Sequence, residues 1–213
     1  KNELIEVSDK YGDDRKTEIV YSSEEFNPED FYADDEMVIT ISHLGYIKRT
    51  PLSEFRTQNR GGVGSKGSDT READFVEYIY MATMHNTMIF FTQKGRCYWL
   101  KVYEIPEGTK NSKGRAIQNM LNIDADDKVN AFVHVKNLAD KDFVNSHYLM
   151  FCTKNGVVKK TCLEAYSRPR TNGVNAITIR EDDRVIEVAM TNGDNEIVLA
   201  NKNGRAIRFH EGV

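Results

Sequence analysis

Cysteine, tryptophan and long apolar runs are scarce in this 213-residue chain, and each shortage excludes a class of protein. The three cysteines, Cys97, Cys152 and Cys162, lack the close, paired spacing of zinc sites and disulfide frameworks. No apolar stretch approaches the roughly 20 residues of a membrane span, and residues 1–5 lack the apolar core of a signal peptide. We therefore expect reduced thiols and a cytoplasmic location, with no membrane partner.

The motifs of the common hydrolases and metalloenzymes are also missing. The sequence contains no Gly-x-Ser-x-Gly, His-Glu-x-x-His or Cys-x-x-Cys, and its five histidines show no metal-ligand spacing. The glycine-rich stretch 60–67 is not a nucleotide-binding loop, because no Gly-Lys-Ser/Thr ends it. We expect the chain to be non-catalytic and to hold no metal or cofactor of its own.

Negative charge is concentrated at one end of the chain. Residues 1–36 carry 4 Lys/Arg and 13 Asp/Glu, a net of −9, whereas residues 37–213 carry 25 and 20, a net of +5. We interpret residues 1–36 as the tail of a helix with an acidic linker, and residues 37–213 as a separate domain. The acidic run is either ordinary solvated surface or an anionic arm that competes for a basic groove.

The chain does contain one hairpin pattern four times. Each copy is an apolar strand, a polar turn that ends in glycine, and a second strand. The copies lie at residues 37–47, 88–97, 149–158 and 197–206, and their turn glycines are Gly45, Gly95, Gly156 and Gly204. Glycine provides the positive φ that such a turn needs. Repeats at spacings of 50, 61 and 48 residues are typical of propeller blades or arrays.

A further strand accompanies each hairpin. An Asp-x-Val pattern begins predicted strands at 76–83, 129–135 and 185–191, and short strands are predicted at 116–117 and 176–177. We place each of the three longer strands in the same unit as the hairpin that follows it. The prediction is an all-β, propeller-like array of four-stranded antiparallel blades over residues 37–213, incomplete at about three to four blades.

Basic residues recur on the strand after each turn. The second residue past each glycine is apolar and should face the core, and its neighbours are often basic. These neighbours are Lys48, Arg49, Lys159, Lys160 and Arg208, and in the second repeat the matching pair is Tyr98 and Trp99, followed by Lys101. A positive stripe of this kind is typical of proteins that bind phosphate backbones. Lysines that protect edge strands from aggregation explain the same pattern equally well.

Arginine, lysine and glycine also gather in the loops after these strands. Glycines let backbone N–H groups approach an anion, and arginine forks grip phosphate oxygens. The first loop contains Arg56, Gln58, Arg60, Gly61, Gly62, Gly64 and Lys66, and the later loops contain Lys113, Arg115, Arg168 and Arg170. The same chemistry in successive repeats favours a DNA-binding perimeter made of these residues and the basic strand residues.

One loop carries a recognisable motif. Residues 58–64, Gln-Asn-Arg-Gly-Gly-Val-Gly, resemble the Gln-Arg-Arg-Gly-Gly-Lys-Gly box of the DNA gyrase A family. Residues 39–49 resemble the first blade of that family's C-terminal domain, and residues 3–19 resemble the end of its breakage–reunion region. The resemblance covers essentially the whole chain. Asn59 and Val63 depart from the box and remove two positive charges, which Arg56 and Lys66 stand close enough to replace.

The resemblance implies a β-pinwheel, a propeller-like disc whose blades are joined unusually and whose basic perimeter bends duplex DNA. In the family this domain serves a type II topoisomerase that introduces negative supercoils. ATP and Mg²⁺ act through other domains, the catalytic tyrosine lies upstream, and the partners are gyrase B and a second copy of gyrase A. Bending without base reading implies binding that is nearly sequence-independent and weakened by salt.

Three alternatives stay open. The equivalent domain of topoisomerase IV would hold DNA without strong wrapping, although the box argues against it. A propeller platform for protein partners would mix charges along the rim. A propeller enzyme would need converging carboxylates or histidines, which the sequence does not indicate.

Overall fold

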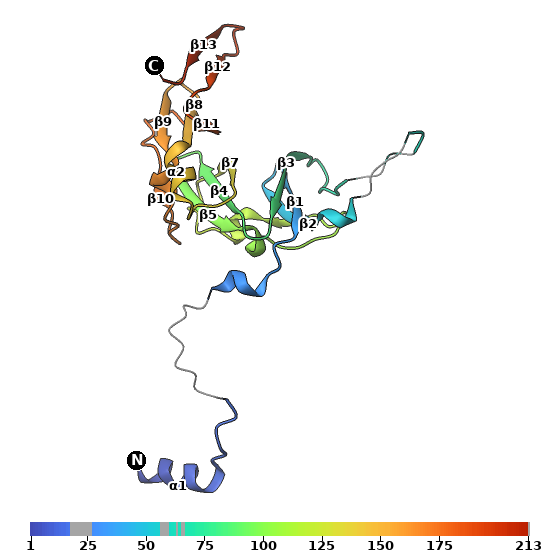
Figure 1. Cartoon of the computed structure of the whole chain (residues 1–213), viewed down its shortest axis with the longest axis vertical. Helices are drawn as coiled ribbons and strands as arrows, with labels where there is room; N and C mark the ends of the chain where they lie inside the picture. Colours follow the sequence, from blue (N-terminus) through green and yellow to red (C-terminus); the bar gives the residue numbers. More distant parts are fainter. Residues whose placement is uncertain (18–26, 56–59, 63, 65–66, 213) are drawn as a thin grey trace. The chain divides into compact units, whose positions relative to one another are not determined.

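The computed structural model describes residues 1–17, 27–55, 60–62, 64 and 67–212 (Figure 1). The chain divides into two units, Lys1–Phe31 and Tyr32–Val213. The first contains helix α1 (Asn2–Tyr11) and a 3₁₀ turn η1 (Pro28–Phe31). The helix ends before Gly12, which is extended at φ −69° and needs no left-handed conformation. Among the described residues, no helix is long and apolar enough to cross a membrane.

The second unit contains the four predicted hairpins. They are β1 (Glu36–Ser42) with β2 (Tyr46–Pro51), β4 (Thr87–Thr92) with β5 (Arg96–Lys101), β8 (Tyr148–Thr153) with β9 (Val158–Cys162), and β12 (Glu196–Ala200) with β13 (Ala206–His210). The four turn glycines have φ between +75° and +84°, which confirms the predicted positive φ. Past them, residues 47 and 97 are buried as expected, whereas Val158 is half-buried and Ala206 exposed.

The longer accompanying strands are β3 (Val76–Thr83), β7 (Val129–Val135) and β11 (Val185–Thr191), at the predicted bounds. The short strands are β6 (Arg115–Ala116) and β10 (Val174–Asn175), one and two residues earlier than predicted. Short 3₁₀ turns follow four strands: η2 (Leu52–Glu54), η3 (Val102–Glu104), η4 (Ile117–Asn119) and η5 (Leu163–Tyr166). A helix, α2 (Lys141–Ser146), precedes β8 and is capped by Asp140.

The strands form four antiparallel sheets. Their orders are β3-β1-β2-β6 in the first sheet, β10-β5-β4-β7 in the second, β11-β8-β9 in the third and β12-β13 in the fourth. The short outermost strand of each four-stranded sheet comes from the segment after the next hairpin, so neighbouring sheets exchange strands. The all-β, propeller-like architecture is confirmed, and the sheets of the described chain do not close into a ring.

The placement of strands 76–83, 129–135 and 185–191 in the same blade as the following hairpin is wrong, because each pairs with the preceding hairpin. β3 pairs with β1, where Tyr80 lies opposite Ile39, and both edges of β4 are occupied by β5 and β7. The physical reason is that β5 and the following strand β7 occupy both edges of β4, so that β3 has no edge of β4 to pair with. The faces of β4 are buried as well: Ile89 and Phe91 point into one core cluster, and Met88 and Phe90 into the other.

The Asp-x-Val pattern has a structural cause. Asp127 accepts the backbone N–H of Lys94 at 3.2 Å, in the hairpin turn of its sheet, and that of Lys128 at 2.8 Å. Asp74 and Asp183 accept the equivalent pairs in the first and third sheets. Each aspartate therefore joins the start of β3, β7 or β11 to the turn of the hairpin in the same sheet. It does so by accepting hydrogen bonds from backbone N–H groups that would otherwise lack partners.

Candidate nucleic-acid interface

Three loops at the outer edge of the sheets occupy equivalent places in the repeat, and we call them the outer loops. They comprise residues 60–64 (of which 63 lies outside the described residues), 106–114 and 167–173. Each follows the second strand of a hairpin and its 3₁₀ turn. The second and third lead directly into the exchanged outermost strands β6 and β10.

Glycine is required where these loops meet the neighbouring sheet. Gly114 and Gly173 have φ of +71° and +66°, and each would place a Cβ 2.7 Å from a carbonyl oxygen, of Ile47 and Cys97 respectively. A side chain at either position would separate the exchanged strand from the sheet that receives it. Gly61 shares the positive φ, at +83°, but faces open space.

Exposed cations follow the outer loops. Arg60 lies on the first loop, Lys113 on the second with Arg115 beside it at the start of β6, and Arg168 and Arg170 on the third; all five are exposed. The Arg168 guanidinium lies 3.8 Å from the Glu164 carboxylate, with its side chain 87% exposed. An exposed pair at this distance leaves the arginine available to other anions.

Segments that flank the outer loops contact the outer loop of a neighbouring repeat. The N–H of Asp69, just past the first loop, donates to the Lys110 carbonyl at 2.9 Å, and the Lys110 N–H donates to Glu54 at 3.2 Å. Between the second and third repeats, the Asn122 side-chain amide donates to Asn172 at 3.4 Å. The cations are therefore carried by neighbouring segments.

Arg170 borders two grooves. One, of about 460 Å³, is lined by Trp99, Lys101 and the 120–122 segment. The other, of about 390 Å³, is lined by Lys159, Thr161 and Arg168. Both are open depressions with basic side chains at their edges, a shape that suits a phosphate backbone better than an enclosed small molecule.

Lys48 and Arg49 do not lie on an exposed rim, contrary to expectation. They are 3% and 8% exposed. The Lys48 ammonium donates to three backbone carbonyls, of Thr109 at 2.9 Å, Lys110 at 3.0 Å and Ser112 at 2.8 Å. Burial lowers the pKa of Lys48, and the carboxylates of Asp69 and Glu54 oppose that shift. Its hydrogen bonds hold the second outer loop against β2.

Arg49 makes the same kind of contact one residue later. Its guanidinium donates to the Tyr103 carbonyl at 2.6 Å and to the Ile105 carbonyl, and it pairs with Glu107 at 3.0 Å. The Lys48 ammonium and the terminal nitrogens of Arg49 thus bind the neighbouring repeat, whereas the buried Nε of Arg49 has no hydrogen-bond partner among the described residues. The expected continuous positive strip along the strands is thus replaced by exposed cations on the loops.

The remaining basic strand residues differ in their surroundings. The half-buried Lys101 donates to the His85 carbonyl at 3.2 Å, and the exposed Lys159 donates to the Ala176 carbonyl at 2.6 Å. Lys160 pairs with the buried Glu211 at 3.0 Å, and the 71%-exposed Arg208 side chain pairs with Glu196 at 3.0 Å.

Other members of the predicted set lie at the first outer loop. Gly61, Gly62 and Gly64 are exposed there. Arg56, Gln58 and Lys66 lie outside the described residues, as do the two positions that depart from the box, Asn59 and Val63.

The sequence analysis placed Trp99 on the outer strand of the second repeat but did not predict its contact with the next repeat. Trp99 donates its indole N–H to the Tyr166 carbonyl at 3.0 Å, across the junction of the second and third sheets. The available signal was its position, the fourth after a hairpin glycine, where Arg49 and Lys160 also stand.

Within the described ranges, no group of three or more His, Cys, Asp or Glu side chains is arranged to hold a metal ion. Cys97 is buried, and burial raises the pKa of its thiol far above the ordinary value, so the thiolate that a nucleophile needs is suppressed.

Comparison with known proteins identifies a family. A family model described as the DNA gyrase C-terminal domain, beta-propeller, matches residues 36–82, 86–136, 147–192 and 195–212. The DNA gyrase A protein of Halalkalibacterium halodurans is 43% identical over 211 residues, which are 99% of this chain and 25% of that protein. The DNA gyrase A protein of Aeromonas salmonicida is 41% identical over 212 residues, 100% of this chain and 22% of that protein. The chain spans about a quarter of the length of these relatives.

Solved structures share the fold. The C-terminal domain of DNA topoisomerase IV superposes with a TM-score of 0.67 and 29% identity, covering 84% of this chain and 53% of that one. The DNA gyrase A C-terminal domain superposes with a TM-score of 0.62 and 20% identity, covering 83% and 55%.

Proposed function

Because the chain belongs to the DNA gyrase C-terminal domain family, we propose that it binds duplex DNA along its outer loops and bends it. The observation that carries the proposal is that each of the three outer loops has exposed arginine or lysine and that flanking segments link these loops from one repeat to the next. A duplex backbone that follows them meets positive charge at every repeat. Smooth bending of a short duplex costs on the order of 1–6 kcal/mol, and repeated phosphate contacts must offset that cost.

We further propose that the parent polypeptide acts in a type II topoisomerase that introduces negative supercoils. The ATP and Mg²⁺ of that reaction would act in other domains, with gyrase B and a second copy of gyrase A as partners. Support comes from the relatives, both of which are DNA gyrase A proteins. In this assembly the chain positions DNA and breaks no bond.

The proposal is tested by removing cations from the outer loops. Arg115→Ala, Arg168→Ala and Arg170→Ala together should weaken duplex binding at every sequence tested. If each arginine neutralises one phosphate, the slope of log K against log salt becomes shallower by about 0.9 per contact. The measurement is fluorescence anisotropy of a labelled duplex titrated at several salt concentrations.

A matched control removes the same charge elsewhere. Lys141, Lys154 and Arg184 are exposed and lie outside the outer loops. Their triple alanine variant should keep most of the salt slope. If the two triple variants lose affinity equally, binding follows net charge alone and the outer-loop interface is wrong.

A topoisomerase IV-type role is the second candidate, favoured by the superposition on the topoisomerase IV domain. Such a domain would hold DNA without strong chiral wrapping. Ligation of DNA circles in the presence of the chain separates the two, because chiral wrapping shifts the linking number and simple holding leaves it unchanged.

A further inference from the structure

The fourth residue after each of the first three hairpin glycines binds the next repeat. Arg49, four residues after Gly45, donates to the carbonyl of Ile105. Trp99, four residues after Gly95, donates to the carbonyl of Tyr166 at 3.0 Å. Both acceptors are the tenth residue after the glycine of the next hairpin. The same contact thus recurs with an arginine and a tryptophan, whose shared property is a long side chain with an N–H donor.

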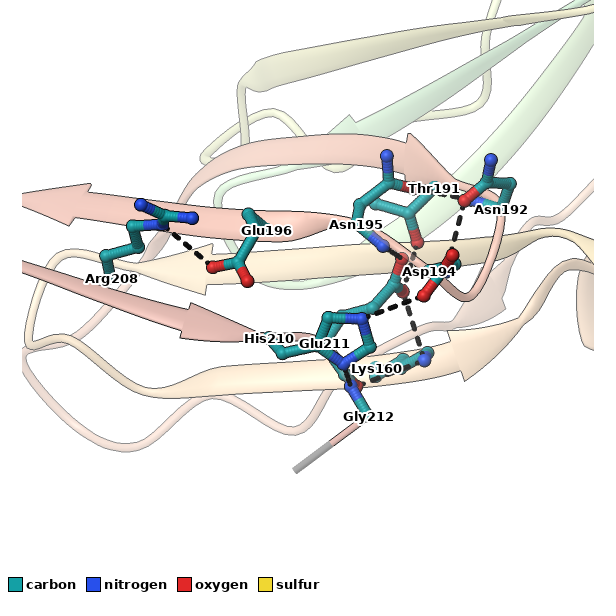
Figure 2. Close-up of polar contacts among 10 residues, drawn as sticks. All are labelled: Lys160, Thr191, Asn192, Asp194, Asn195, Glu196, Arg208, His210, Glu211 and Gly212. Atoms are coloured by element: carbon teal, nitrogen blue, oxygen red, sulfur yellow. Dashed lines mark hydrogen bonds and ion pairs between the residues drawn. The ribbon is translucent and has the colours of Figure 1, made fainter.

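Lys160 is the third member of this series, four residues after Gly156. Its ammonium donates to the carbonyl of Glu211 at 3.1 Å and pairs with the Glu211 carboxylate at 3.0 Å (Figure 2). The ring of Tyr148 lies 4.3 Å from the ammonium. Lys160 therefore reaches into the fourth hairpin as Arg49 and Trp99 reach into the second and third.

Glu211 stands where the earlier repeats place an apolar residue. Val102 and Leu163, each seventh after its glycine, are fully buried, and Glu211 at the same position is 4% exposed. Its carboxylate also accepts the Thr191 hydroxyl at 2.7 Å and the Asn195 N–H at 2.7 Å (Figure 2). A buried carboxylate that accepts hydrogen bonds from three donors is a fixed part of the structure rather than a surface ion pair.

Polar contacts join the fourth hairpin to the third sheet. Among the described residues, neither core cluster contains a side chain from β12 or β13. The network of Lys160, Thr191, Asn195 and Glu211 therefore links the hairpin to β9 and β11 of the third sheet.

We propose that Lys160 and Glu211 are positioning residues that set the direction of the fourth hairpin, and that Lys160 is not a phosphate contact. The proposal rests on the proposed DNA bending, because its consequence is where the exposed Arg208 on β13 meets the duplex. We call the contact between Lys160 and Glu211 the joint. With the joint intact, the fourth hairpin continues the path of the outer loops. With the joint broken, the hairpin swings and the bend shortens, while most phosphate contacts persist.

Opposite charge changes provide the decisive test. Lys160→Met removes a positive charge and Glu211→Gln removes a negative one. If the two residues form a joint, both variants reduce the bend of a doubly labelled duplex measured by energy transfer, and the double variant loses no more than the larger single loss. A salt slope within about 0.3 of the wild-type value is expected, because no phosphate contact is lost.

A phosphate contact predicts the reverse pattern. Lys160→Met would then flatten the salt slope by about 0.9 and Glu211→Gln would strengthen binding. Either result overturns the joint, and so do two single variants that bend DNA like the wild type. Failure of the wild-type chain to bind or bend DNA would instead refute the proposed function on which the joint rests.

Controls guard against general unfolding and simple charge effects. The exposed Lys141→Met and Glu181→Gln make the same charge changes outside the network and should bend DNA like the wild type. Thr191→Val keeps the shape of a side chain in the network while removing one donor, and should give a bend between the wild type and Glu211→Gln. If Thr191→Val bends DNA like the wild type while Glu211→Gln does not, the hydrogen-bonded joint is wrong.

Discussion

Replacing Lys48 by methionine should destabilise the second unit strongly. The ammonium satisfies three carbonyls of the second outer loop at 2.8–3.0 Å, in a residue only 3% exposed. Methionine keeps an unbranched apolar side chain of similar size but leaves these three carbonyl acceptors unpaired. A buried acceptor left without a partner costs about 1–3 kcal/mol.

The second outer loop is partly exposed to water, which limits the total loss in the free energy of unfolding. Thr109 is exposed and Lys110 and Ser112 are half-buried, so water recovers part of the lost hydrogen bonding. Removing the ammonium also relieves its own desolvation, which already lowers the pKa of Lys48. We therefore expect a loss of about 3 kcal/mol in the free energy of unfolding, which corresponds to roughly 6–12 °C in Tm for a unit of this size.

The single tryptophan provides the assay. Trp99 is half-buried at the junction of the second and third sheets, so its emission reports loss of that junction during urea unfolding. Lys113→Met, on the exposed part of the same loop, is the control and should change the unfolding free energy by less than about 0.5 kcal/mol. Equal, small effects of the two substitutions would refute a structural role for Lys48. Normal stability with uniformly weaker DNA binding would assign Lys48 to phosphate instead.

Two further predictions follow from the same contacts. Gly95→Ala should destabilise far more than Gly156→Ala in urea unfolding: both glycines have positive φ, but a Cβ on Gly95 would lie 2.1 Å from the Ile177 carbonyl, whereas Gly156 faces open space, and equal losses would contradict this. Burial would raise the pKa of Glu211, but hydrogen bonds from Thr191, Lys160 and Asn195 outweigh it and hold the pKa below its usual 4.5. The stability that this group contributes is then complete above pH 4.5 and lost as pH falls through the folded-state pKa, so the urea midpoint of the wild type should fall more steeply below pH 4.5 than that of Glu211→Gln, and parallel curves would rule out the shift.

The sequence predicts strands well where a short pattern of residues forms a structural feature nearby in the chain, such as a capped turn. The bounds of β3, β7 and β11 were predicted because Asp74, Asp127 and Asp183 begin them, and each aspartate caps a turn in its own sheet. The hairpin glycines were predictable for the same reason, since the positive φ of the turn is a property of the turn alone. Signals of this kind need no knowledge of distant parts of the chain.

Pairing and burial were harder to predict because they depend on distant segments. Nothing local distinguishes a β3 that pairs back to β1 from one that pairs forward to β4; the choice follows from the occupation of both edges of β4. Lys48 likewise appeared as a surface cation because its acceptors lie 61–64 residues later, in an irregular loop that only strand exchange brings close. Composition could not separate the basic residues that hold loops from those that face solvent.

Position within the repeat distinguishes the basic residues that hold neighbouring repeats together from those that face solvent. At the fourth residue after the glycine, Arg49, Trp99 and Lys160 all donate to the next repeat, and the uncharged tryptophan among them shows that the position selects for a hydrogen-bond donor rather than for charge. A row of phosphate contacts would have no reason to include an indole with its N–H already committed to a carbonyl. In contrast, the exposed Arg115, Arg168 and Arg170 stand on or beside loops whose backbone is held by other residues. Lys48, Arg49 and Lys160 thus hold neighbouring repeats together, and the loop cations are left to face a polyanion.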